Sequence, residues 1–280
     1  MQVSNLGTLG LASQQAIGTG ALNKTSRALE KILERLSTVQ RSNRASDDAA
    51  GLAVSEQLRT QIRGFKMATQ NAVDTQSALN IAEGAGTEVE SMLQRQRELA
   101  IQARNDTLTD KQRGMLDTEY QQITQEINRI PQATQFNTQQ VAAGQGLGSG
   151  TAQAQVGANA GDQITLPKND MTAVGLGVAG TSIASSAGAS TALTAIDAAL
   201  DQLHTQRSNI GAMVNRLEST INNLSVAEIN TQAAESALRD QDMAKGLADL
   251  VQQQILYQGG TKTFARFNEI SYNHLLGLLK

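Results

Sequence analysis

The sequence predicts a mainly α-helical fold, with long antiparallel helices from both chain termini forming a coiled-coil rod and small β-hairpins in the middle. Three observations predict this fold class. Aromatic residues make up 2% of the 280 residues and there are two prolines, which suits aliphatic, alanine-rich helices. Heptad spacings occur near both ends of the chain. Ten of the 24 glycines fall between 144 and 188, where charged residues are scarce.

The first predicted helix covers residues 22–41. Leu22, Leu29 and Leu36 lie seven residues apart, and Ile32 follows Leu29 by three. This a/d pattern, with charged residues on the other faces, is typical of a helix that needs a partner.

The second predicted helix runs from Ser46 to about residue 104, with a kink expected at the glycines of segment 83–86. Ser46 stands where an N-cap belongs, and Asp47 and Asp48 fall in the first turn, where negative charge meets the positive end of the helix dipole. A metal site or an acid/base pair would need further ligands, and this half of the chain contains no histidine. We therefore favour the capping interpretation.

A capping box at Thr109 and Gln112 predicts the start of another helix, which extends to about residue 129. Residues 132–189 offer short alternating segments and Gly/Asn turns, so small hairpins are expected there. The Ser/Ala/Gly run at 180–190 suggests a flexible joint.

Helical spacing returns near residue 190. A second capping box, Ser225 with Glu228, predicts a fresh helix start after a soft interruption at Asn222–Asn223. The last segment again has a heptad spacing, carried by Met243, Leu250, Tyr257 and Phe264. Neither terminal heptad segment has a partner near it in sequence, so the two are expected to pair with each other, antiparallel.

The composition also excludes function classes. A net charge of −3 gives no basic surplus for nucleic acid or an anionic membrane, and the absence of cysteine excludes disulfides and thiolate chemistry. We find no nucleophile–base constellation and no phosphate-binding loop, so no catalytic, cofactor-binding or metal-ligating residue is predicted, and the protein is not expected to be an enzyme. No membrane insertion and no cleaved signal peptide are expected, because no basic segment precedes an apolar run and no long apolar window occurs.

Amphipathic terminal helices are association sites. We expect residues 1–42 and about 240–280 to be largely disordered in a free subunit and to fold when neighbouring copies bury their apolar side chains. Contacts of this kind that do not close into a ring produce an open helical polymer. The predicted assembly interface comprises Leu22, Leu29, Ile32, Leu36, Leu247, Leu250 and Leu256. The alternative is a coiled-coil signalling rod of the chemoreceptor type.

Three long motifs resemble bacterial flagellins. RSNRASDDAAGLAVSEQLRTQIRGF resembles the family's N-terminal signature, LQRQRELAIQARN with ITQEINRI and TQFN its outer-rod region, and SALRDQDMAKGLADLVQQQIL its C-terminal signature. The chain departs from the family's polar C-terminal turn by carrying Phe264, Phe267 and Tyr272. Because the central region is short, large outer domains are not expected.

The resemblance implies a self-assembling subunit of the flagellar filament, serving motility. It implies an inner coiled-coil domain from residues 1–42 with 240–280, an outer helical domain from 43–131 with 190–239, and a short central region, 132–189. It further implies export by the flagellar secretion apparatus without a cleaved signal, with an external filament favoured over a periplasmic one. The partners it implies are copies of the chain, an export chaperone, and hook-junction and cap proteins.

The resemblance also bears on the innate immune receptor that recognises flagellins. Arg95 and Leu99 match the recognition motif, whereas Gln122 stands where many stimulatory members carry glutamate. The interpretation we favour for Arg95 and Leu99 is packing between subunits, because a stripe at helical spacing usually packs.

Overall fold

The computed structural model describes residues 2–278, and the side chains of 15–270 and 272. Five long helices account for most of the chain, and they confirm the predicted fold class. They are α1 (Gln2–Thr38), α2 (Ala49–Ala103), α3 (Asp110–Ala133), α4 (Ser186–Arg239) and α5 (Met243–Leu278). No helix within the described residues is long and apolar enough to span a membrane.

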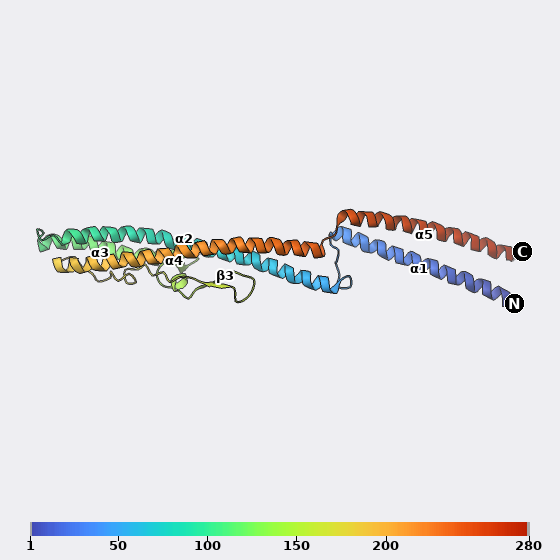
Figure 1. The fold of residues 1–280 in the computed structure, drawn as a ribbon, viewed down its shortest axis with the longest axis horizontal. Coiled ribbons are helices and arrows are strands. Elements are labelled where there is room, and N and C mark those ends of the chain that lie inside the picture. Colours follow the sequence, from blue (N-terminus) through green and yellow to red (C-terminus); the bar gives the residue numbers. More distant parts are fainter. Residues whose placement is uncertain (1, 279–280) are drawn as a thin grey trace. The chain divides into compact units, whose positions relative to one another are not determined.

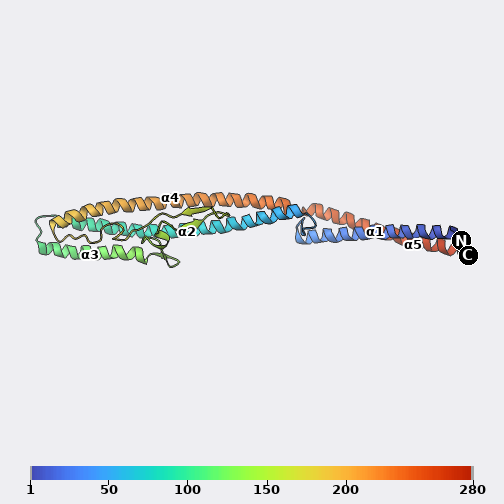
Figure 2. The ribbon, with the colours of Figure 1, turned by 90° about the horizontal axis from the view of Figure 1, so that it is seen from below.

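The chain divides into two compact units. One contains the residues up to Arg59 together with those from Gln232 onward, and the other is Thr60–Thr231. In the first unit, α1 and α5 lie side by side and antiparallel, as Figures 1 and 2 show. This arrangement confirms the predicted pairing of the two terminal heptad segments.

The second unit has a continuous hydrophobic core between helices. α2 and α4 lie side by side in both views, with α3 beside them (Figures 1 and 2). Large side chains from all three helices are fully buried in this core, among them Leu93, Leu99, Tyr120, Ile127, Leu203 and Ile210. At the surface, the Arg97 guanidinium on α2 pairs with Asp197 on α4 at 2.7 Å. Burial of this extent gives the second unit a core of its own.

The segment between α3 and α4 contains two antiparallel hairpins, as the glycine-rich composition predicted. β1 (Gln135–Phe136) pairs with β2 (Gln139–Gln140), and β3 (Gln153–Gln155) pairs with β4 (Gln163–Thr165). A short 3₁₀ helix, η1 (Gly146–Gly148), lies between them. The β3–β4 hairpin rests on α2, where the Asn71 side chain donates to the Gln155 carbonyl at 3.2 Å and Gly64 leaves room for Ala158.

Two local predictions at helix starts are wrong. The N-cap of α2 is Asp48, not Ser46: the Asp48 carboxylate accepts the Gly51 N–H at 2.8 Å, and α2 begins at Ala49. The capping box at Ser225 and Glu228 starts no helix, because α4 runs through it without a break. The buried side chain of Leu224 keeps that part of α4 against its neighbours, which overrides the local capping preference.

The Ser/Ala/Gly run at 180–190 is also not a flexible joint. The Ile183 N–H donates to the Asp117 carboxylate at 2.7 Å, and the Thr181 carbonyl accepts from the Gln121 side chain at 2.9 Å. Residues 186–190 of the run form the start of α4. By contrast, the capping box at Thr109 is confirmed, since its N–H donates to the Gln112 side chain at 2.9 Å at the start of α3.

Candidate assembly interface

The two terminal helices bury little of their apolar surface within one chain. Of the predicted interface residues, the partly buried ones are Leu22, Leu29, Ile32, Leu36 and Leu250. Leu247 and Leu256 are 51% and 54% exposed. Among the side chains that the structure describes in this unit, none of the apolar ones is fully buried. A lone helix pair can cover only one stripe of each helix, so its other faces stay open.

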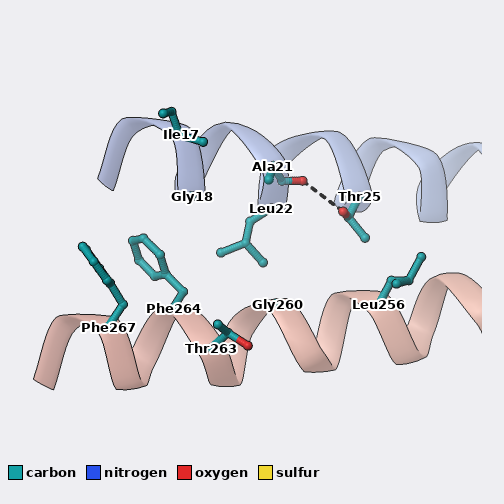
Figure 3. A pocket seen from close by; sticks show the side chains of 10 residues that line it. All are labelled: Ile17, Gly18, Ala21, Leu22, Thr25, Leu256, Gly260, Thr263, Phe264 and Phe267. Carbon is teal, nitrogen blue, oxygen red and sulfur yellow. Dashed lines mark hydrogen bonds between the residues drawn. The ribbon is translucent and has the colours of Figure 1, made fainter. Parts of the chain in front are cut away.

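An apolar groove of about 670 Å³ lies between α1 and α5. Figure 3 shows Leu22 and Phe264 pointing into the gap between the helices, whereas Ile17 points away from α5. Ile17 is 71% exposed. Small residues on α1, Gly18 and Ala21, line the same groove and leave space in it. The α1–α5 pair therefore exposes apolar surface both in the groove between the two helices and on the face of α1 that points away from α5.

A second apolar hollow of about 610 Å³ lies along α5 alone. It is formed by Leu247, Val251 and Ile255, which recur every four residues, together with the neighbouring Ala248, Gln252 and Leu256. Burying one such large aliphatic side chain is worth about 1.5–3 kcal/mol. Three of them exposed in one row form a strong association surface.

Heptad reasoning missed Val251 and Ile255, because they lie outside the a/d positions assigned to the α5 segment. The signal that could have found them is a row at four-residue spacing, Met243, Leu247, Val251 and Ile255, all exposed in the structure. A helix with two apolar rows can contact α1 with one row and a different helix with the other.

The segment between α1 and α2 is tied to the end of α1 by charge. The Asp47 carboxylate contacts the Lys31 ammonium at 2.5 Å, and Glu34 accepts hydrogen bonds from the Asn43 and Arg44 side chains at 3.0 Å. The hydrogen bond from Lys31 holds the pKa of Asp47 below its ordinary value. Asp47 and Asp48 thus serve as an ion-pair partner and an N-cap, which accounts for both carboxylates without a metal or acid/base role.

The end of α1 is joined by backbone hydrogen bonds to the junction between α4 and α5. Arg41 N–H donates to the Arg239 carbonyl at 2.7 Å, and Gln241 N–H donates to the Val39 carbonyl at 3.0 Å. The Arg239 guanidinium also donates to Glu56 at 2.8 Å. These bonds lie where α1 ends and α5 begins, so the α1–α5 pair is anchored at this end.

The three residues expected from the family's receptor motif lie in different environments. Arg95 is exposed and its guanidinium donates to Glu119 at 2.7 Å and to Glu98 at 2.9 Å, which raises its pKa. Leu99 is 1% exposed and packs in the core of the second unit. Gln122 is exposed on α3. Of the three, Arg95 and Gln122 lie at the surface of the chain.

A helical unit with its own core, joined in sequence to a helix pair with open apolar faces, defines a structural protein with a built-in association surface. Comparison with known proteins gives the particular family. Residues 12–146 match the bacterial flagellin N-terminal helical region, and residues 193–279 match the bacterial flagellin C-terminal helical region. The chain belongs to the bacterial flagellin family.

Individual relatives agree. The chain is 45% identical over 242 residues to a flagellin of Halalkalibacterium halodurans, covering 86% of this chain and 88% of the relative. It is 38% identical over 267 residues to the flagellar filament 31.3 kDa core protein of Treponema maltophilum, covering 91% and 93%.

Among solved structures, the chain is similar in fold to a putative flagellar hook-associated protein of Vibrio parahaemolyticus. The TM-score is 0.56 at 18% identity, covering 69% of this chain and all of that one (100%).

Membership of this family decides two predictions. Flagellins are structural proteins, so the expectation that the chain is not an enzyme is confirmed. The alternative interpretation, a signalling rod of the chemoreceptor type, has no support among the relatives.

Proposed function

We propose that this chain is the structural subunit of a bacterial flagellar filament and that α1 and α5 complete their folding when copies of the chain pack together. The observation that carries the proposal is the burial difference between the two units: large side chains are fully buried in one, whereas those described in the helix pair are half-buried or exposed. Since helix nucleation is costly, a pair so poorly covered gains most of its stability from neighbours.

The domain boundaries proposed from the sequence follow the same logic. Residues 1–42 with 240–280 form the inner filament-core domain, which is the part that needs neighbours. Residues 43–131 with 190–239 form the outer helical domain, and 132–189 form the central region. Coupling the folding of the inner domain to assembly keeps the free subunit soluble and narrow enough for export.

The proposal also covers how the chain is exported and where the filament lies. Export passes through the flagellar secretion apparatus without a cleaved signal, and the filament is external to the cell. Along this route the chain contacts an export chaperone and, in the filament, hook-junction and cap proteins. Mass measurement of the protein purified from sheared external filaments tests both points: an intact Met1 or simple loss of Met1 is expected, and absence of the chain from sheared material contradicts the external location.

Contact with the innate immune receptor is a separate proposal. The exposed residues Arg95 and Gln122 supply the surface that such a receptor would meet, and the ion pairs of Arg95 with Glu98 and Glu119 hold its guanidinium in place. Restoring the family's glutamate with Gln122→Glu should increase receptor signalling in a reporter assay. An unchanged response would contradict a role for this position.

Deleting residues 261–280 tests the central proposal. Circular dichroism of the monomer should change little, whereas sedimentable filaments should be lost, because the deletion removes Phe264 and Phe267 from the α1–α5 seam. A finer variant is Val251→Ser with Ile255→Ser, which keeps the chain length but makes the exposed row on α5 polar. The matched control is Val174→Ser, an exposed valine in the second unit. Normal filaments from the truncated chain would contradict the proposal.

A further inference from the structure

α1 and α5 meet through three contacts of one kind, in which a glycine on one helix faces a large side chain on the other. A methyl group placed on Gly18 would lie 2.9 Å from Cδ2 of Phe264, and one placed on Gly260 would lie 3.1 Å from Cδ2 of Leu22. One placed on Gly246 would lie 2.8 Å from Cδ2 of Leu36. Carbon atoms in van der Waals contact keep about 3.5–4.0 Å, so a methyl group at any of these positions would force the facing side chain to shift. Figure 3 shows two of the contacts, Gly18 with Phe264 and Leu22 with Gly260.

The three contacts share one antiparallel register. Because the helices are antiparallel, moving four residues up the sequence on α1, from Gly18 to Leu22, corresponds to moving four residues down the sequence on α5, from Phe264 to Gly260. The same offset relates Leu36 to Gly246 further along the pair. The glycine is on α1 in the first contact and on α5 in the other two, so each helix supplies both a large and a small member.

This alternation opposes sliding of the two helices. If α5 moved by four residues in one direction, Leu22 would face Phe264 and Leu36 would face Leu250, placing large side chains against each other. In the opposite direction, Leu22 would face Leu256, and Gly18 would face Gly260 across an empty space. Overpacking and cavities both destabilise a helix interface. In the register seen in the structure, Leu22, Leu36 and Phe264 each have a glycine opposite.

We infer that Gly18, Gly246 and Gly260 are the residues that set the register of α1 against α5, and that this register is required for assembly. The second half of the inference rests on the proposed function. A slip of one turn would shift α5 by about 6 Å along α1, at about 1.5 Å per residue. That shift would move the exposed apolar row Leu247, Val251 and Ile255 along the apolar surface of α1. A neighbouring copy that contacts the exposed surfaces of both helices would then fit only one of them.

The chain offers matched controls for a direct test. Gly259 and Gly20 lie beside the register glycines, inside the same helices, and a methyl group on either would meet nothing within 4 Å. Alanine favours the helix equally at all of these positions, so differences between neighbours report the contact and not helix propensity. Critical concentrations for polymerisation, measured by sedimentation, should stay level or fall for Gly259→Ala and Gly20→Ala. They should be several-fold higher for Gly18→Ala and Gly260→Ala than for these neighbouring controls.

A compensating change adds a readout that a general loss of stability would not give. Leu22→Ala removes apolar surface from the predicted interface and also restores the space that Gly260→Ala fills. The double variant should therefore raise the critical concentration by less than the product of the two single-variant increases. An increase equal to or above that product would overturn the inference.

A cross-link then reads the register directly, in the polymer and in the monomer. The Gln15 side chain donates to the Asn268 side chain at 3.2 Å, and the chain contains no cysteine, so Gln15→Cys with Asn268→Cys gives a clean pair for a short bis-maleimide. The cross-link should form in the parent and with Gly259→Ala, and its yield should fall several-fold with Gly260→Ala. If the parent does not polymerise but the cross-link behaves in this way, the proposed function fails and the register stands. Equal yields in the two alanine variants, or no cross-link in either monomer or polymer, would overturn the register.

Discussion

Arg113 is expected to hold the turn between α2 and α3 by capping the C-terminal end of α2. Its side chain is 9% exposed, and its Nε donates to the Ala103 carbonyl, on the last residue of α2, at 2.9 Å. A second guanidinium nitrogen donates to the Asn105 carbonyl at 3.2 Å, and a third donates to Asp110 at 3.0 Å. The last carbonyls of a helix have no partner inside the helix, so this side chain supplies a donor for the Ala103 carbonyl, whereas the Asn105 carbonyl also accepts from the Leu108 N–H at 3.1 Å.

Replacing the side chain with methionine keeps the apolar stem and removes all three donors. The bond to the buried Ala103 carbonyl involves a charged donor and is worth about 1.5–3 kcal/mol, and the longer bond to the Asn105 carbonyl about 0.5–1 kcal/mol. The Asp110 side chain is 91% exposed, so its ion pair adds little. Arg113→Met should therefore lower the free energy of unfolding by roughly 2–4 kcal/mol. For a unit of this size, that lowers the melting temperature by roughly 4–16 °C.

The assay is urea denaturation of the full chain followed by circular dichroism at 222 nm. Arg113→Lys should recover part of the loss, because an ammonium can reach one of the carbonyls but cannot bridge both. Arg129→Met is the matched control on the same helix, since Arg129 is exposed and pairs only with Glu126 among the described contacts. If Arg113→Met and Arg129→Met unfold within about 0.5 kcal/mol of each other, Arg113 does not cap α2 and the reasoning is refuted.

Three further predictions concern stability. Thr138, in the β1–β2 turn, has a φ of 65°, a left-handed backbone conformation that is costly for a branched side chain. Thr138→Gly should therefore raise the free energy of unfolding by about 0.5–1 kcal/mol. A lower free energy of unfolding in urea denaturation would contradict this. Leu93→Ala removes a fully buried side chain and should cost about 2.7–5 kcal/mol, whereas Ile81→Ala, on an exposed face of the same helix, should cost much less; equal losses in urea would show that the burial is not what matters. The pKa of Asp47 is lowered by Lys31, so this pair stabilises the segment between α1 and α2 at neutral pH, and its contribution should disappear as the pH falls below the ordinary value of 3.8. Amide exchange in residues 40–48 should therefore accelerate on acidification relative to α2, and Lys31→Met should weaken that pH dependence; a variant that keeps it in full would exclude the pair as its cause.

Residue spacing was sufficient to predict which segments pair, but not where each helix begins. Leu22, Leu29 and Leu36 identified the face of α1 that meets α5, because side chains seven residues apart share one face of a helix. Nothing in the uncharged N-terminal residues marks Gln2 as the start of α1. At Ser225 a local capping signal was present and the helix ignored it, since burial of Leu224 decides the conformation there. Motifs of four residues report local preference, and packing outweighs them.

The assembly interface was predictable in part for the same reason. Heptad positions gave the leucines of the seam, yet the register between α1 and α5 depends on which glycine faces which large side chain. That match involves pairs such as Leu36 and Gly246, more than 200 residues apart in sequence, and becomes visible only when both helices are placed side by side. A glycine in a helix counts as a weakness by propensity alone, so Gly18 and Gly260 carried no sequence signal for a contact.

The two units differ in how fully their apolar side chains are buried. This difference follows from how many helices pack around each helix, not from helix length. α1 and α5 are 37 and 36 residues long, and α3, with 24, is shorter than either. Yet α3 contributes the fully buried Tyr120 and Ile127, because α2 and α4 lie beside it and close the space from two sides. Two helices alone leave at least half of each circumference to solvent, whatever their length. Additional helices are therefore what the α1–α5 pair lacks, and copies of the same chain can supply them. The exposed row of Leu247, Val251 and Ile255 on α5 is a place where such a helix would gain apolar contact.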